Sequence, residues 1–431
     1  MSYTDVYVSR AYKTSRWAYA MECTFEYFVA LLVADVYLAN VLSYIGMSDA
    51  MAGIVSSFIS LAFVFQILTV GLIKKMKNTK LTVIVFHSLG QFCFMFLYLI
   101  PLISMPTSLK HVLTMVIILL AYFGNYIVHS IMYKWGNSYV RPTGRASFSA
   151  TKEMISLACG MVLTFVVGQI IDRYNKAGDK EGGFLFLAIG ILIFCVCDFV
   201  CILLIKNEPK HVSEELELVP IKATILNLFK NKAYVYIVIL ECMFKCSMFI
   251  TNGFLGVYKT NTLLISIGTA QIINILGCFV RFVLSKPIGR FSDKTSYASG
   301  IVLGLSLYLL GYICLCFTSP STWWMIILMT IFTNVGAAGT SANLFNCTYN
   351  YVDESELVQA MAIKSCISGV IGFSVTFVGA KILSFVQENN DTLLGVHIYG
   401  QQVLAILSCL LFVGTILFAE LVVKKQKRTV R

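Results

Sequence analysis

The chain has 431 residues, of which 58% are hydrophobic and only 13% are charged. A soluble domain carries about 25% charged residues, so this composition excludes a soluble globular protein and indicates an integral membrane protein. The net charge of +11 does not indicate nucleic-acid binding, because the cations are spread over short segments between apolar stretches.

Twelve apolar stretches of membrane length follow one another along the chain. A helix needs about 20 apolar residues to cross the hydrocarbon core, whereas strands of a membrane barrel are shorter and alternate in polarity. We therefore predict an all-α membrane protein with twelve transmembrane helices in two six-helix bundles. The predicted spans lie near residues 23–45, 50–73, 81–103, 111–131, 150–171 and 184–205, and then 233–257, 262–284, 299–317, 322–345, 361–385 and 398–423.

The longest polar interruption divides the chain into domains. We predict a first bundle over residues 1–206, a cytoplasmic linker over 207–232, and a second bundle with a short basic tail over 233–431. Lysines and arginines gather in alternate connections, within residues 74–80, 134–145, 206–232, 286–294 and 424–431. The positive-inside rule then places both termini in the cytoplasm, and we expect a multi-pass protein of the cytoplasmic membrane.

Three short strings occur twice, in the same order, in the two halves. Residues 22–26 (ECTFE) recur as 241–245 (ECMFK), Gly71 before a basic turn recurs as Gly289, and residues 150–156 (ATKEMIS) recur as 362–368 (AIKSCIS). The offsets are 219, 218 and 212 residues, so the halves stay nearly in register. Internal repeats of this kind are typical of transporters built from two pseudo-symmetric bundles.

This organisation resembles the major facilitator superfamily of secondary transporters. The string GRFSDK at residues 289–294 is similar to a loop signature of that family, in which a Gly is followed four residues later by Asp and then by a basic residue. The resemblance implies a gating loop formed by Gly289, Arg290, Asp293 and Lys294. It also implies that Asp293 meets the amino end of the eleventh helix near Lys364. The first-half copy departs from the pattern, because Lys75 stands where the Asp would be.

Charged residues within the first span are candidates for ion coupling. A charge in hydrocarbon costs about 2.5–3.5 kcal/mol on insertion scales, so each one calls for a partner or a cavity. On a straight helix Glu26 and Asp35 point to opposite faces, and Glu26 can reach His129 or Lys134. We predict that Glu26 and Asp35 take part in coupling to a proton or sodium ion. The alternative for Asp35 is a structural hydrogen bond to a neighbouring helix.

The seventh span carries a second pair of candidates. Glu241 and Lys245 are four residues apart, in the orientation that favours an ion pair within a helix. The pair either neutralises itself or lines the cavity wall and breaks during transport. We predict a coupling role for both residues.

Amide and imidazole side chains deep in other spans are candidates for solute binding. Amides donate and accept hydrogen bonds, which suits hydroxyl-rich solutes, although such residues also join helices at about 0.6 kcal/mol each. Together they predict a polar cavity lined by Asn125, His129, Asn252, Gln271, Asn274 and Asn334.

The sequence therefore predicts a secondary active transporter and not an enzyme. It is expected to move a small polar organic solute, preferably sugar-like, by alternating access and in symport with a proton or sodium ion. The chain has no nucleotide-binding loop that ends in Lys-Ser/Thr, which argues against direct use of ATP. The alternatives are efflux of amphipathic, drug-like compounds, a membrane-embedded transferase, or a sensor that does not transport.

The expected partners are the solute, the ion and the lipid bilayer. We expect no nucleic acid and a monomeric protein. No catalytic residue, metal or cofactor is predicted, because Cys195, Cys197 and Cys201 have no further ligands at metal-binding spacing.

Overall fold

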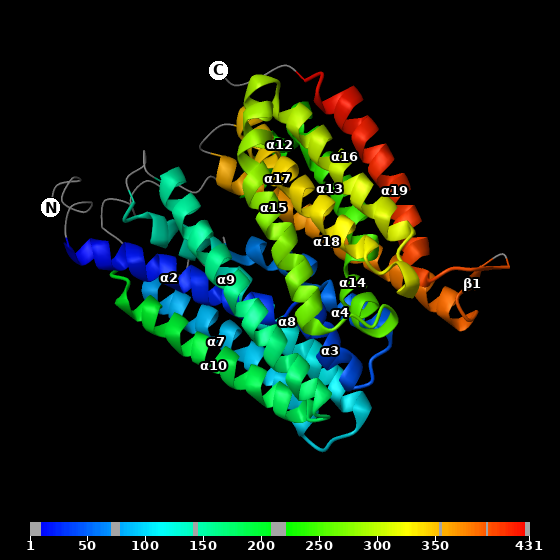
Figure 1. The fold of residues 1–431 in the computed structure, drawn as a ribbon. Coiled ribbons are helices and arrows are strands. Elements are labelled where there is room, and N and C mark those ends of the chain that lie inside the picture. The colour runs from blue at the N-terminus through cyan, green and yellow to red at the C-terminus, as the bar shows by residue number, and fades with distance from the viewer. Residues whose placement is uncertain are drawn as a thin grey trace. The chain divides into compact units, whose positions relative to one another are not determined.

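The computed structural model describes residues 10–69, 78–140, 145–207, 221–352, 356–393 and 395–426. Helices account for nearly all of these residues (Figure 1). Within the described part of the chain, β-structure is confined to the hairpin of β1 (Thr392–Leu393) and β2 (Val396–His397). Two compact units are formed: unit 1 comprises Met1–Met47 and Phe65–Leu218, and unit 2 comprises Ser48–Val64 and Val219–Arg431.

The first span, in unit 1, is a bent pair of helices and not one straight helix. Helix α2 (Arg10–Leu32) meets α3 (Asp35–Tyr44) at a 45° bend. Asp35 has a φ of +47°, a left-handed value that interrupts a right-handed helix. The prediction of a straight span over 23–45 was therefore wrong at its centre and at its start. Because residues 10–22 are polar, a criterion based on apolar length missed the first turns of α2.

Four long helices complete unit 1, and a buried aromatic cluster holds their ends together. Trp135 is fully buried, and its Nε1 donates a hydrogen bond to the Lys206 carbonyl oxygen at 2.9 Å. The Tyr139 hydroxyl donates to the same carbonyl. These bonds join the segment that follows the last helix of the unit, which ends at Leu204, to the end of the helix that contains Trp135. The helices are α7 (Thr79–Leu99, extended by η2, Ile100–Leu102), α8 (Thr107–Asn137), α9 (Arg145–Lys176) and α10 (Lys180–Leu204).

Unit 2 contains a second set of long helices and several short ones. The long helices are α13 (Lys232–Asn252), α15 (Ile267–Lys294), α16 (Tyr297–Cys316), α17 (Met325–Tyr351), α18 (Leu357–Glu388) and α19 (Gly400–Phe418). The short elements are α4 (Asp49–Ser56), α5 (Phe58–Ala62), α12 (Ile221–Lys230), α14 (Leu255–Val257), η4 (Tyr258–Thr262), η5 (Pro320–Thr322) and η6 (Ala419–Val423). The short helix η1 (Phe63–Ile67) follows α5 across the boundary between the units.

Glycines allow α16 and α17 to pack very closely. A Cβ atom on Gly336 would lie 2.8 Å from the Gly304 carbonyl oxygen, and one on Gly339 would lie 2.8 Å from the Gly304 Cα. Real Cβ atoms do not approach other atoms so closely, so only glycine fits at this contact. Small residues that let backbones touch are typical of helix contacts in membranes.

The segment Ser48–Val64 packs within unit 2, although it lies early in the chain. The Ser60 hydroxyl donates to the Gly369 carbonyl oxygen at 3.0 Å, which joins α5 to α18. Gly53 on α4 lies directly against the Phe254 ring. The units therefore do not coincide with the predicted domains over this segment.

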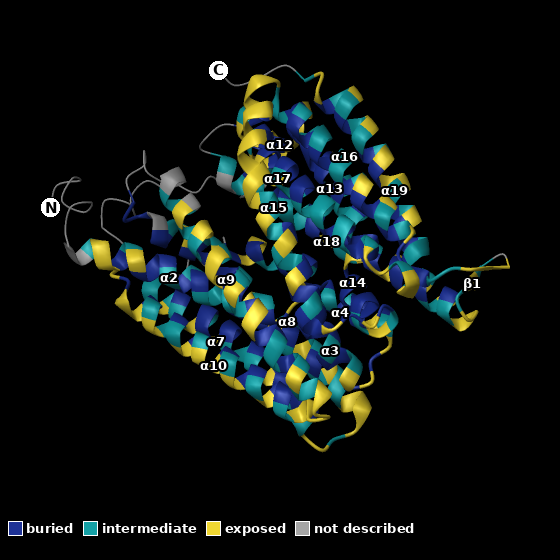
Figure 2. Ribbon diagram, in the orientation of Figure 1, coloured by how far each residue is buried: buried dark blue, intermediate teal, exposed yellow. Residues whose placement is uncertain are grey.

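The number of spans agrees with the prediction. In the described ranges, eleven helices are long and apolar enough to cross a membrane, and the bent pair α2–α3 makes a twelfth. Large apolar side chains remain exposed along these helices; on α15, for example, Ile272, Phe279 and Phe282 are exposed. Figure 2 colours many positions of α15 as exposed. Exposed apolar surface of this extent is expected for a protein that is surrounded by lipid. The prediction of a twelve-helix membrane protein is confirmed.

Candidate functional site

Three ionisable side chains from three helices meet in the interior of unit 1. Glu22 on α2, His87 on α7 and Asp198 on α10 are 0%, 3% and 1% exposed. His87 Nε2 lies 3.1 Å from Asp198 Oδ2, a hydrogen bond, and 3.5 Å from Glu22 Oε1, an ion-pair distance without hydrogen-bond geometry. Glu22 Oε1 and Asp198 Oδ1 have no hydrogen-bond partner among the described residues. We call these three residues the unit 1 cluster.

Local contacts fix the position of Glu22 in this cluster. The Cys23 thiol donates to Glu22 Oε2 at 3.2 Å, and the hydroxyls of Thr24 and Ser156 lie 3.0 Å apart, which joins α2 to α9. Glu22, His87 and Asp198 were not predicted to meet. The available signal was that each is ionisable, lies within a span and therefore needs a partner.

In unit 2 the buried ion pair joins Glu241 to Lys364. Lys364 Nζ on α18 lies 2.7 Å from Glu241 Oε2 on α13, and it donates to Thr348 Oγ1 at 3.1 Å. The Ser368 hydroxyl donates to Glu241 Oε1 at 3.3 Å. The predicted pair between Glu241 and Lys245 was therefore wrong, because a lysine from α18 reaches the carboxylate directly.

Lys245 is held by aromatic rings instead. Its Nζ lies 5.6 Å from the ring centre of Phe63 and 5.5 Å from that of Phe249, both within the range of cation–π attraction. The side chain is half-buried. Lys245 thus remains a half-buried cation that forms no ion pair with Glu241, although the charges of Glu241 and Lys364 both act on it.

The sequence repeat relates the charged sites of the two units. Glu22 corresponds to Glu241, and Lys152 corresponds to Lys364. Lys152 does not pair with Glu22; its Nζ donates to the Tyr19 hydroxyl at 3.3 Å and lies 4.6 Å from the ring centre. His87 is the partner of Glu22 instead. One unit therefore pairs its repeated glutamate with a titratable imidazole, and the other pairs it with an ammonium group.

The other predicted coupling residues occupy different surroundings. Glu26 is half-buried on α2, and neither of its predicted ion pairs, with His129 or with Lys134, is found among the described residues. Asp35 is half-buried and opens α3 at the bend of the first span. Because the helix is broken there, Glu26 and Asp35 do not lie on one straight helix, and their spacing does not place them on opposite faces.

In unit 1 the two predicted solute-binding residues differ in their surroundings. Asn125 is buried, accepts a hydrogen bond from Gln91 Nε2 at 3.2 Å and donates to the Ala121 carbonyl oxygen at 3.0 Å. It therefore joins α7 to α8. His129 is exposed, and its ring stacks on Tyr126 with the ring centres 5.9 Å apart.

The four predicted solute-binding residues of unit 2 also vary in exposure. Asn252 is exposed at the end of α13, Gln271 is buried in α15, and Asn274 is half-buried in the same helix. Asn334 is half-buried and donates to the Thr330 carbonyl oxygen at 2.9 Å. Of the four, Asn252 is exposed, whereas Asn274 and Asn334 are both half-buried.

The predicted gating residues lie in a helix and not in a loop. Gly289, Arg290, Asp293 and Lys294 form the last turns of α15, and only two residues separate this helix from α16. Ser296 caps α16 by accepting a hydrogen bond from the Ser299 N–H at 3.0 Å. The two helices need no longer loop because α15 continues to Lys294 and this cap starts α16 directly. The first-half counterpart, Lys75, lies outside the described residues.

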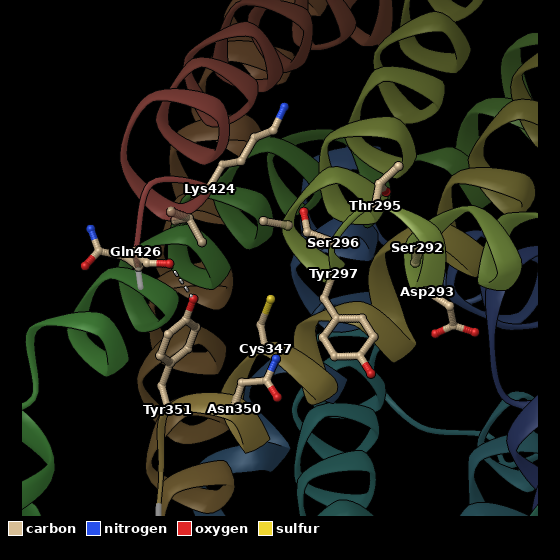
Figure 3. Close-up of a pocket in the computed structure, with 12 residues that line it drawn as sticks. Ser292, Asp293, Thr295, Ser296, Tyr297, Cys347, Asn350, Tyr351, Lys424 and Gln426 are labelled. Atoms are coloured by element: carbon tan, nitrogen blue, oxygen red, sulfur yellow. Dashed lines mark hydrogen bonds between the residues drawn. The ribbon is translucent and has the colours of Figure 1, made fainter. Parts of the chain in front are cut away.

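Asp293 lines a polar cavity of about 380 Å³ at the end of unit 2. The cavity is bordered by the ends of α15, α16 and α17 and by η6, as Figure 3 shows. Tyr351 closes one side, and its hydroxyl donates to the Gln426 carbonyl oxygen at 3.2 Å. Lys364 pairs with Glu241 and not with Asp293, so the contact implied between Asp293 and Lys364 is not found. The gating role of Asp293 stays a prediction.

The comparisons with known proteins identify the family. The model of the Major Facilitator Superfamily matches residues 154–377, just over half of the chain. The chain belongs to the Major Facilitator Superfamily. A search of curated protein sequences finds no significant match.

Solved structures of several transporters resemble this one over nearly the whole chain. A mutant of the nucleoside transporter NupG is 13% identical with a TM-score of 0.74, over 94% of this chain and 99% of that one. A D-xylose–proton symporter is 14% identical with a TM-score of 0.68, over 94% and 97%. An auto-inhibited peptide transporter of the POT family is 12% identical with a TM-score of 0.68, over 98% and 99%. At these identities the likeness shows the fold alone.

The family membership settles the class of protein. The chain is a multi-pass secondary transporter and not an enzyme, as predicted. Its buried charges therefore lie inside the bundles of a transporter, where an ionisable residue marks a solute path, an ion path or a structural pair.

Proposed function

We propose that this transporter takes up a small polar organic solute, preferably sugar-like, in symport with a proton or a sodium ion. One observation supports ion coupling: each unit buries a glutamate at the same repeat position, next to a basic side chain from another helix, His87 in unit 1 and Lys364 in unit 2. Buried charges are expensive in a membrane protein and are retained mainly where they serve function. Glu241, Lys245 and Glu26 join the unit 1 cluster as the coupling charges of this proposal.

The solute class rests on the polar side chains and on the structural neighbours. His129 and Asn252 are exposed, and their side chains can donate and accept hydrogen bonds. The neighbours include a D-xylose–proton symporter and a nucleoside transporter, and both D-xylose and nucleosides carry several hydroxyl groups. These similarities favour a hydroxyl-rich solute and, for the ion, a proton.

The proposed setting follows from the charge distribution. The basic connections on one side of the spans favour a protein of the cytoplasmic membrane with both termini inside the cell. We propose that it works as a monomer. The last turns of α15 are the proposed gate at its cytoplasmic end. The gating residues are Gly289, Arg290, Asp293 and Lys294.

The test is uptake by purified protein in proteoliposomes. Labelled D-xylose, uridine, a dipeptide and an organic acid are each offered with an imposed proton gradient, with a sodium gradient or with none. We expect accumulation of D-xylose or uridine that an inward proton gradient drives and a protonophore abolishes. Extrusion of an amphipathic dye in place of uptake would support efflux, and no gradient-driven movement of any probe would contradict the proposal.

A further inference from the structure

The unit 1 cluster differs from the Glu241–Lys364 pair in its charge balance. In unit 2 one carboxylate faces one ammonium group at 2.7 Å, and the pair is neutral. In unit 1 two carboxylates share a single imidazole nitrogen, His87 Nε2. Even with a protonated imidazole, the three side chains carry one negative charge in excess. All three are at least 97% buried, and an uncompensated buried charge is strongly unfavourable.

The groups around the cluster do not supply the missing positive charge. Lys152 on α9, which corresponds to Lys364 in the repeat, is held by the Tyr19 ring and hydroxyl and forms no ion pair with Glu22 among the described residues. Glu26, four residues along α2, adds a further carboxylate. The other ionisable groups that interact with the cluster are Tyr19 and Cys23 on α2, His129 on α8, and Cys195 and Cys201 on α10.

Two carboxylate oxygen atoms of the cluster can accept a proton. Glu22 Oε1 and Asp198 Oδ1 are buried acceptors without a hydrogen-bond donor in the described structure. A proton on either carboxyl group forms an O–H bond, removes the excess charge and leaves the imidazolium paired with the other carboxylate. This solution needs no change in the backbone.

We propose that Glu22, His87 and Asp198 form the proton-binding site of this transporter. Glu26, one helical turn from Glu22 on α2, is half-buried and is therefore more accessible than the three residues of the cluster. Proton binding itself stands on the cluster alone, whereas its use in coupling rests on the proposed symport.

Infrared difference spectroscopy of the purified full-length protein tests proton binding without any solute. As the pH is lowered, the wild type should show the carbonyl stretch of a buried protonated carboxyl group. This band should be lost in Glu22→Gln or Asp198→Asn and shifted in frequency in the charge-conserving variants Glu22→Asp and Asp198→Glu. The conservative variants keep the test decisive where a neutral variant does not fold. Asp35→Asn, another membrane carboxyl of unit 1, is the control and should keep the band.

Three results would overturn the assignment. The first is a band that survives in both Glu22→Gln and Asp198→Asn, and the second is one that disappears only in Asp35→Asn. The third is stabilisation of the wild type by added Zn²⁺ that His87→Gln abolishes, which would make the cluster a metal site.

Vesicle transport then separates this proposal from the proposed function. Suppose the wild type shows the band but accumulates none of the probes: the proton site stands and the symport proposal fails. Suppose instead that a proton gradient drives accumulation equally in the wild type, Glu22→Gln and Asp198→Asn: symport stands and the site is wrong. Our expectation is loss of gradient-driven accumulation in both variants, with solute exchange across the membrane retained.

Discussion

Glu241 Oε2 on α13 lies 2.7 Å from Lys364 Nζ on α18. The same ammonium group donates a hydrogen bond to Thr348, which precedes Lys364 by sixteen residues. The contact joins the first and fifth long spans of unit 2 through a pair that is nearly inaccessible to water, since Lys364 is 2% exposed. Lys245, one helical turn from Glu241, is not part of it.

Removal of the lysine should destabilise the protein strongly. Lys364→Met leaves the buried Glu241 carboxylate without its ion-pair partner, and the loss of one partner of a buried pair typically costs about 3–5 kcal/mol. Thermal or denaturant unfolding of the detergent-solubilised protein measures the effect. The double variant Glu241→Gln/Lys364→Met should recover much of the stability, because no charge is then left unpaired.

Lys424→Met is the matched control for that series. Lys424 also pairs with a glutamate, Glu420, at 2.5 Å, but its side chain is 41% exposed. Exposed pairs contribute little, so its unfolding should match the wild type. Equal losses in Lys364→Met and Lys424→Met would contradict the role given to burial.

Gly336→Ala should destabilise the contact between α16 and α17. The new methyl group would lie 2.8 Å from the Gly304 carbonyl oxygen, and overpacking of this kind costs about 1–3 kcal/mol. Gly190→Ala on α10 is the control, because a Cβ there meets nothing within 4 Å. We expect a lower unfolding temperature for Gly336→Ala only, and the reverse order would show that the glycines are not packing notches.

Substitutions at Asp35 distinguish a backbone role from ion coupling. Asn tolerates the left-handed conformation, so Asp35→Asn should unfold like the wild type, whereas Asp35→Val should lose about 1–2 kcal/mol. If coupling resides in the unit 1 cluster, Asp35→Asn should also keep gradient-driven accumulation in proteoliposomes. Loss of accumulation in a stable Asp35→Asn protein would restore Asp35 as the coupling residue.

Asn125 and His129 were predicted as one set, and the structure predicts different outcomes for them. Asn125→Ala removes the hydrogen bond from Gln91 and should lower stability by about 0.6 kcal/mol with little effect on half-saturation of uptake. His129→Ala removes an exposed ring and should raise the half-saturating solute concentration at unchanged stability. The pair of measurements, uptake and unfolding, checks both, and identical behaviour of the two variants would refute the distinction.

The architecture could be predicted because span length and repeated strings are properties of sequence alone. Twelve apolar stretches and three repeated strings suffice for two bundles of six helices. The bend at residues 33–34 could not be predicted, because it depends on one backbone angle at Asp35. The first turns of α2 were missed because they are polar. The gating string was placed in a loop because it is similar to a loop signature of the family, whereas α15 continues through it to Lys294.

The site was harder to predict, because partners on different helices cannot be paired from spacing. Glu241 and Lys245 have favourable spacing within one helix, yet the lysine of another helix forms the bond. Glu22, His87 and Asp198 are far apart in sequence and meet only through the packing of α2, α7 and α10. Spacing along one helix says nothing about which residue a neighbouring helix presents at the same depth.

The placement of Ser48–Val64 bears on how this protein could be divided and reassembled. The backbone leaves unit 1 after residue 47, contributes α4 and α5 to unit 2, and returns at residue 65. A polypeptide cut after residue 218 would therefore yield a second fragment that lacks the helix hydrogen-bonded to Gly369. Neither fragment should be stable when produced alone, whereas co-production of both should restore a complete protein by complementation, with the missing helices donated in trans.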